Sequence, residues 1–101
     1  MAFKITVEDP EEFEDRVKKG DVEVSLATVD TILNNLTGRK RFIHTLDIQF
    51  LSEGVTHNLT TDRRDFIEIL KKHLPVLEKN ELYEKCAKIM EAIKFLKNQN
   101  S

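Results

Sequence analysis

The sequence predicts an α+β fold, because some segments alternate apolar and polar residues as strands do, and others repeat apolar residues at helical spacing. A third observation is size: 101 residues, of which 40% are hydrophobic, suit a single α+β domain (1–101) with one modest core. We expect the order β-α-(β)-α-β-β-α-α. In this arrangement a small antiparallel sheet, formed by the hairpin 41–60 and the N-terminal strand, packs against about four helices.

The first strand and helix are predicted at the N-terminus. Residues 3–7 alternate between apolar and polar side chains, which is typical of a half-buried strand. Asp9 then has the position of an N-cap, Pro10 suits the first helical position, and Glu12 stands where a capping box places its acid. Gly20 predicts a left-handed helix end.

The segment from 21 to 38 predicts a short extended piece over 21–24 and then a second helix. Ser25 is the expected N-cap, and Gly38 follows the expected end of the helix. The apolar residues between them recur at helical spacing, at Leu26, Val29, Ile32, Leu33 and Leu36.

The clearest strand signal is the hairpin 41–60. Even positions from Phe42 to Phe50 are mostly apolar, odd positions from Thr45 to Gln49 are polar, and Glu53-Gly54 marks a turn. A two-residue turn would place Ile48 opposite Leu59. A three-residue turn suits Glu53 better, because Gly54 would take the bulge position, but it pairs Ile48 with Asn58. We favour the two-residue turn, since its face pattern holds along the whole ladder.

Two helices are predicted at the C-terminal end. Asp62 is the expected cap of the first, which we expect Pro75 to interrupt. The second runs from about Val76 to Lys97 and carries an apolar seam at Leu82, Cys86, Ile89, Ile93 and Leu96. This seam either covers the sheet or pairs with a second copy in a homodimer. The residues assigned to that dimer contact are Leu82, Tyr83, Ile89, Met90, Ile93 and Leu96.

The sequence contains no recognisable catalytic or metal-binding set, so we expect no enzymatic activity, no metal and no cofactor. Cys86 falls within the apolar seam, where a thiol is hidden. In the favoured register His44 and His57 are roughly 20 Å apart, too far to share a metal. The 3 glycines are too scattered for a phosphate loop. Acidic residues crowd 8–15, but a helix N-terminus attracts acids without any catalytic role.

The cellular compartment is predicted from the single cysteine and from the lack of a membrane span or signal-peptide core in the sequence. One cysteine cannot form an internal disulfide, which fits a reducing environment. No stretch approaches the ~20 apolar residues of a membrane span, and no signal-peptide core begins the chain. These features predict a cytoplasmic protein that does not enter a membrane.

Charge is unevenly distributed along the chain, although the formal total is only −2. Residues 1–38 hold 4 basic and 9 acidic side chains, whereas 39–64 hold 5 basic and 3 acidic ones. The basic residues flank the hairpin, whose open end brings them together beside the helix start at Asp62; they are Arg39, Lys40, Arg41, Arg63 and Arg64. Such a cluster is either a solvated surface or a site for a phosphate or an acidic protein. Nucleic acid is disfavoured by the negative total and the missing RNA-binding motifs.

These observations predict a small non-catalytic binding or regulatory protein, an adaptor that docks to another macromolecule, most simply a protein. Its charged patches would be the contact surfaces. The alternative is a small anion- or nucleotide-binding protein that uses the basic cluster and the helix N-terminus at Asp62. A third hypothesis, an enzyme with a site assembled across a dimer, lacks any nucleophile or metal set.

Overall fold

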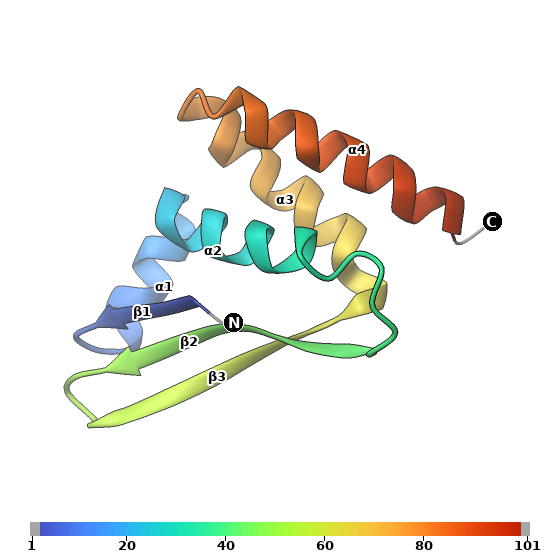
Figure 1. The fold of residues 1–101 in the computed structure, drawn as a ribbon. Coiled ribbons are helices and arrows are strands. Elements are labelled where there is room, and N and C mark those ends of the chain that lie inside the picture. Colours follow the sequence, from blue (N-terminus) through green and yellow to red (C-terminus); the bar gives the residue numbers. More distant parts are fainter. Residues whose placement is uncertain (1–2, 100–101) are drawn as a thin grey trace.

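The computed structural model describes residues 3–99 and confirms the α+β fold (Figure 1). Its elements are β1 (Phe3–Val7), α1 (Pro10–Lys18), α2 (Val22–Leu33), β2 (Phe42–Phe50), β3 (Val55–Asp62), the 3-10 turn η1 (Arg63–Asp65), α3 (Phe66–Lys79) and α4 (Tyr83–Gln99). The short extended piece predicted over 21–24 is wrong, because α2 already begins there.

The sheet is mixed, so the wholly antiparallel sheet that we predicted is wrong. The strand order is β1-β2-β3, with β1 parallel to β2 and β2 antiparallel to β3. The connection explains the parallel pair: α1 and α2 together carry the chain back to the end of the sheet where β1 began, so β2 runs in the same direction.

Neither predicted hairpin register is correct. Phe50 pairs with Val55, so the loop spans residues 51–54 and Leu59 lies opposite Leu46 instead of Ile48. The backbone amides of Glu53 and Gly54 both donate to the carbonyl of Phe50, and Gly54 takes the left-handed conformation at φ 65°. From Leu46 to Phe50 the observed register differs from the favoured one by two residues, which leaves the residues of this part of the strand on their predicted faces.

A β-bulge between His44 and Leu46 reverses the faces of the first part of β2. Leu46, Ile48 and Phe50 point into the core as predicted. Before the bulge the buried residue is Ile43, and Phe42 is 56% exposed. The prediction that even positions face the core along the whole strand is therefore wrong at Phe42.

Several helix boundaries also differ from the prediction, and α4 begins at Tyr83 instead of about Val76. Asp21, not Ser25, caps α2 by accepting the amide N–H of Val24. Helix α3 continues through Pro75 to Lys79, and the chain turns at Glu81, which has φ 58°. A proline inside a helix costs about 3 kcal/mol. Continuing the helix keeps Leu77 fully buried, which offsets most of that cost.

Helix α2 lies between the sheet on one side and α3 and α4 on the other (Figure 1), and a group of buried side chains fills each of the two contacts. One group joins α2 to the sheet and consists of Ile5, Val7, Val24, Ala27, Leu46, Ile48 and Phe50. The other joins α2 to α3 and α4 and consists of Val29, Ile32, Ile43, Phe66, Leu70, Leu77, Cys86, Ile89, Ala92, Ile93 and Leu96. Within residues 3–99, no helix combines the length and apolar character of a membrane span.

Candidate docking site at the basic end of the hairpin

The five predicted cationic residues do meet at the open end of the hairpin. Phe42 pairs with Asp62, and the amide of Arg63 donates to the carbonyl of Arg41 at 2.6 Å. We call the cluster of Arg39, Lys40, Arg41, Arg63 and Arg64 the basic hairpin end. The predicted pairing of Ile43 with Arg64 is wrong, since Ile43 faces Thr61, but the clusters flank the hairpin and converge in either register.

Arg63 is turned inward and holds the fold together. Its Nε donates to the carbonyl of Lys40 at 2.7 Å, and its Nη1 donates to the carbonyl of Asn35 at 2.5 Å. The guanidinium also lies over the ring of Phe66, 5.1 Å from its centroid. Gly38 permits this approach, because a Cβ there would stand 2.8 Å from Nη2 of Arg63. Arg63 therefore ties the loop before β2 to the end of β3.

Asp62 occupies the position that a bound anion would take. Its carboxylate accepts the amide N–H of Arg64 at 3.0 Å and so caps η1. The same carboxylate pairs with Nε of Arg41 and Nη2 of Arg64, each at 3.2 Å. The backbone amide of Arg64 and the side chains of Arg41 and Arg64 are thus already served by a carboxylate of the chain itself, whereas Asp65, the N-cap residue of α3, makes no capping hydrogen bond with its side chain.

The remaining surface of the basic hairpin end faces outward. Arg39 and Lys40 are exposed, as are the side chains of Arg41 and Arg64. The guanidinium of Arg41 lies 4.9 Å from the ring centroid of the exposed Phe42. Beside them a surface cavity of about 310 Å³ opens, lined by Arg63, Arg64, Ile67 and Leu96. Cations, one aromatic ring and a partly apolar hollow are therefore adjacent.

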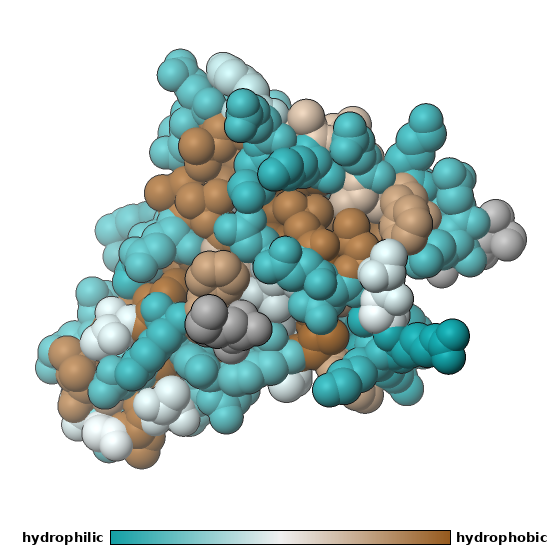
Figure 2. Space-filling view, viewed as in Figure 1, coloured by the Kyte–Doolittle hydropathy of each residue, from teal (hydrophilic) through white to brown (hydrophobic). Residues whose placement is uncertain are grey.

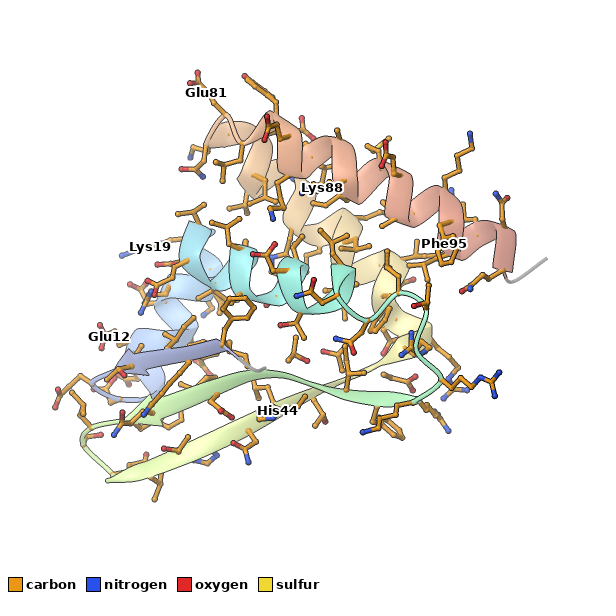
Figure 3. All side chains as sticks on the ribbon, in the orientation of Figure 1. Glu12, Lys19, His44, Glu81, Lys88 and Phe95 are labelled. Atoms are coloured by element: carbon orange, nitrogen blue, oxygen red, sulfur yellow. The ribbon has the colours of Figure 1, made fainter. Side chains whose placement is uncertain are left out.

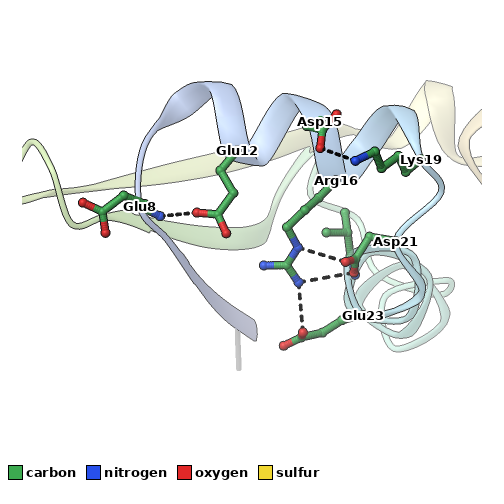
Figure 4. A network of polar contacts seen from close by, with 8 residues as sticks. Glu8, Glu12, Asp15, Arg16, Lys19, Asp21 and Glu23 are labelled. Carbon is green, nitrogen blue, oxygen red and sulfur yellow. Dashed lines mark hydrogen bonds and ion pairs between the residues drawn. The ribbon is translucent and has the colours of Figure 1, made fainter.

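The acidic segment lies at the opposite end of the sheet, on and before α1 (Figure 1). Asp9 caps the helix as predicted, and a carboxylate oxygen of Glu12 accepts the amide N–H of Glu8. Arg16 bridges Asp21 at 2.9 Å and Glu23 at 3.0 Å (Figure 4), and the hydrogen bond from Arg16 lowers the pKa of Asp21. These pairs fix α1 to the start of α2.

The histidines lie apart from one another, and residues 3–99 contain no group of three potential metal ligands. His44 contacts Asp47, and the ring of His57 meets that of Phe50 edge to face at 5.1 Å. Since His44 pairs with Thr60, it stands roughly 10 Å from His57 along the strand. That is half the predicted separation, because the register differs.

A buried Ser–His contact is the polar pair that the sequence did not reveal. Ser25 Oγ lies 2.8 Å from His73 Nδ1 beside a cavity of about 60 Å³, and the serine is only 2% exposed. Burial lowers the pKa of His73, so its imidazole is neutral at pH 7. Because 48 residues separate the two in sequence, no local pattern signals the contact.

Most of the residues assigned to a dimer contact on α4 pack within the chain. Ile89, Ile93 and Leu96 are buried in the core and Leu82 is half-buried, whereas Tyr83 and Met90 are exposed. Cys86 is buried as predicted, and that burial raises the pKa of its thiol. The apolar surface that α4 offers to a partner is therefore smaller than the full seam.

A further groove separates α2 from α4. Its volume is about 310 Å³, and its lining residues are Leu33, Leu36, Lys88, Glu91, Ala92 and Phe95. Lys88 and Phe95 project from α4 (Figure 3), and apolar side chains gather between the two helices on the molecular surface (Figure 2).

Comparison with protein-family models, curated proteins and solved structures finds no match for this chain.

Proposed function

We propose that this chain is a non-catalytic adaptor of the cytoplasm that docks to another protein through its basic hairpin end. One observation carries the proposal. The carboxylate of Asp62 already pairs with Arg41 and Arg64, where a small anion would bind, while the side chains of Arg39, Lys40 and Arg41 are exposed beside the exposed Phe42. A surface of exposed arginines next to an exposed aromatic ring has the composition of a protein–protein contact, in which aromatic residues and arginine are enriched.

The arrangement favours a macromolecular partner over a free phosphate or nucleotide. A small anion at the helix start would have to displace the carboxylate of Asp62 or approach it closely, at a cost in repulsion. An acidic protein surface can instead contact the outward faces of Arg39, Lys40 and Arg41 and leave Asp62 in place. The nucleotide-binding alternative predicts a rise in melting temperature with millimolar nucleotide, which a thermal-shift assay would detect.

The acidic α1 is the second surface of the proposed adaptor. The exposed carboxylates Glu11 and Glu14 lie at the end of the sheet opposite the basic hairpin end. Two surfaces of opposite charge at opposite ends of one small protein suit a bridge between an acidic and a basic partner.

Affinity capture from the native cell tests the docking surface when it is done with matched charge variants. The triple variant Arg39→Glu, Lys40→Glu, Arg41→Glu should lose the captured partner. The control Lys79→Glu, Lys94→Glu, Lys97→Glu makes the same change in net charge on exposed helical positions and should retain it. A partner retained equally by both variants would rule out the basic hairpin end as the docking surface.

A further inference from the structure

The strand β3 is an open edge of the sheet. Within residues 3–99 its only neighbour is β2, and every residue from 55 to 60 is exposed. Val55, His57 and Leu59 pair with the buried residues of β2 and so share their face, yet they are exposed. The strand β3 lies on the side of β2 away from β1 and from the helices (Figure 1). Figure 2 shows apolar and weakly polar side chains exposed around the hairpin tip. Both faces and the outer edge of β3 are therefore accessible.

The backbone of β3 presents a regular row of hydrogen-bonding groups to the outside. The amide of Arg63 points to β2, since it donates to the carbonyl of Arg41. Because these directions alternate along an antiparallel strand, the odd-numbered residues of β3 point inward. The N–H and C=O groups of Thr56, Asn58 and Thr60 consequently point away from the sheet.

Although the β2–β3 pair contains a bulge, which lies in β2, this edge lacks several other devices by which proteins prevent strands from pairing with other chains. Such devices include a short strand, a lysine or proline on the edge, and a covering helix. β3 has 8 residues and contains no lysine, arginine or proline. The other edge, β1, has 5 residues with Lys4 among them, and α1 and α2 pack beside it.

The charges at the two ends of β3 are complementary to each other. Arg64 follows the C-terminal end of the strand and is exposed, and the exposed Glu53 lies in the loop before its N-terminal end. In an antiparallel pair of identical strands, the end that carries Arg64 lies next to the end of the partner strand that carries Glu53. The two-fold symmetry repeats this contact at the other end of the pair. A second copy of this chain thus satisfies both ends at once.

We infer that β3 pairs antiparallel with β3 of a second copy, about a two-fold axis at Asn58. The two sheets of three strands become one continuous sheet, and the helix layers of both copies lie on the same face. Val55 and Leu59 of each copy then line the floor between these layers. The contact is closed, because each copy uses its single bare edge. It involves Arg64 of the basic hairpin end but leaves Arg39, Lys40 and Arg41 free on the β2 side, so the variants that test the proposed docking do not alter this contact.

Sedimentation equilibrium of the full chain from micromolar to near-millimolar concentration tests the pairing. We expect a reversible monomer–dimer equilibrium. Asn58→Pro removes the outward N–H at the two-fold axis, and with it both hydrogen bonds there, so the dissociation constant should rise roughly tenfold or more. Asn58→Ala keeps the backbone donor and is the matched control, with an unchanged dissociation constant. Circular dichroism verifies that each variant retains its fold.

A charge exchange tests the same contact without touching the strand. Arg64→Glu and Glu53→Arg each place like charges together across the interface and should weaken the dimer. The double variant restores opposite charges and should recover it. Arg39→Glu alters the charge to the same extent as Arg64→Glu but lies on the β2 side, so it should leave the equilibrium unchanged.

Three results would overturn the inference. A monomer at every concentration excludes self-pairing and leaves the proposed docking surface untouched. A dimer unaffected by Asn58→Pro and by both single charge reversals places the contact elsewhere. Mass that grows continuously with concentration contradicts a closed two-fold pair.

Discussion

The strands β1 and β3 are the two edges of one sheet, and both alternate apolar with other residues, but their surroundings differ. In β1, Ile5 and Val7 are 3% and 2% exposed. In β3, the residues of the corresponding face lie beyond the helices, and Leu59 is 40% exposed. The alternation is similar in the two strands, and the burial is not.

The difference shows that coverage of a strand depends on how the chain enters and leaves it. The crossover from β1 to β2 passes through α1 and α2, which must lie over those two strands. β3 is added to the far side of β2 by a tight hairpin, so no helix is carried with it. An alternating pattern therefore predicts a strand but not what covers its apolar face.

The largest expected difference between the two edge strands is the loss in free energy of unfolding when one apolar residue of each is truncated. Ile5→Ala removes a buried side chain and should lower the free energy of unfolding by about 2–5 kcal/mol. Leu59→Ala removes an exposed one and should cost below about 1 kcal/mol. Urea denaturation at low protein concentration measures both. Equal losses would mean that β3 is covered even in the monomer.

The next effect concerns the point where β3 rejoins the helices. Arg63→Ala removes hydrogen bonds to the carbonyls of Asn35 and Lys40 and the contact with Phe66, and should destabilise the protein by about 2 kcal/mol. Arg64→Ala, which removes an exposed ion pair from the adjacent position, should cost about 0.5 kcal/mol. If the two variants unfold at the same urea concentration, Arg63 does not have the structural role assigned to it.

A smaller effect concerns His73, a largely buried histidine of the covered part of the molecule, away from the bare strand. Burial lowers the pKa of His73 below its ordinary value of 6.5, so the unfolded chain binds a proton that the native chain does not. The free energy of unfolding should therefore fall as the pH drops below 6.5, towards the native pKa of His73. His73→Gln should reduce this loss, because the substituted side chain has no imidazole to protonate in the unfolded chain. Unfolding curves at several pH values give the slopes.

The smallest effect is expected on the outer face of α4. Tyr83→Ser and Met90→Ser alter exposed side chains and should change the free energy of unfolding by less than about 0.5 kcal/mol each. Neither should shift the monomer–dimer equilibrium, since the paired edge is β3. If either variant dissociates the dimer, the contact lies on α4, as the heptad-like spacing first suggested.

Local signals in the sequence predicted the elements and several of their ends. Asp9 is an N-cap and Gly20 is left-handed as expected, because each depends on groups within a few residues. Asp62 caps the 3-10 turn η1 before α3, and the N-cap of α3 itself is Asp65. The convergence of the cationic residues could also be predicted, since they flank a hairpin. The role of Arg63 could not be predicted, because its partners include Asn35, which is distant in sequence.

By itself the sequence determined the α+β class, the strand and helix segments, and the charge at each end of the hairpin, since periodicity and composition are local properties. Tertiary structure decided the rest. In the folded chain β1 pairs parallel to β2, and α3 continues through Pro75. A bulge in β2 places Phe42 on the exposed face, and Ser25 contacts His73. Tertiary structure also left β3 uncovered. Each of these outcomes depends on which surfaces the packed helices bury, and that balance is set by contacts between residues far apart in the chain.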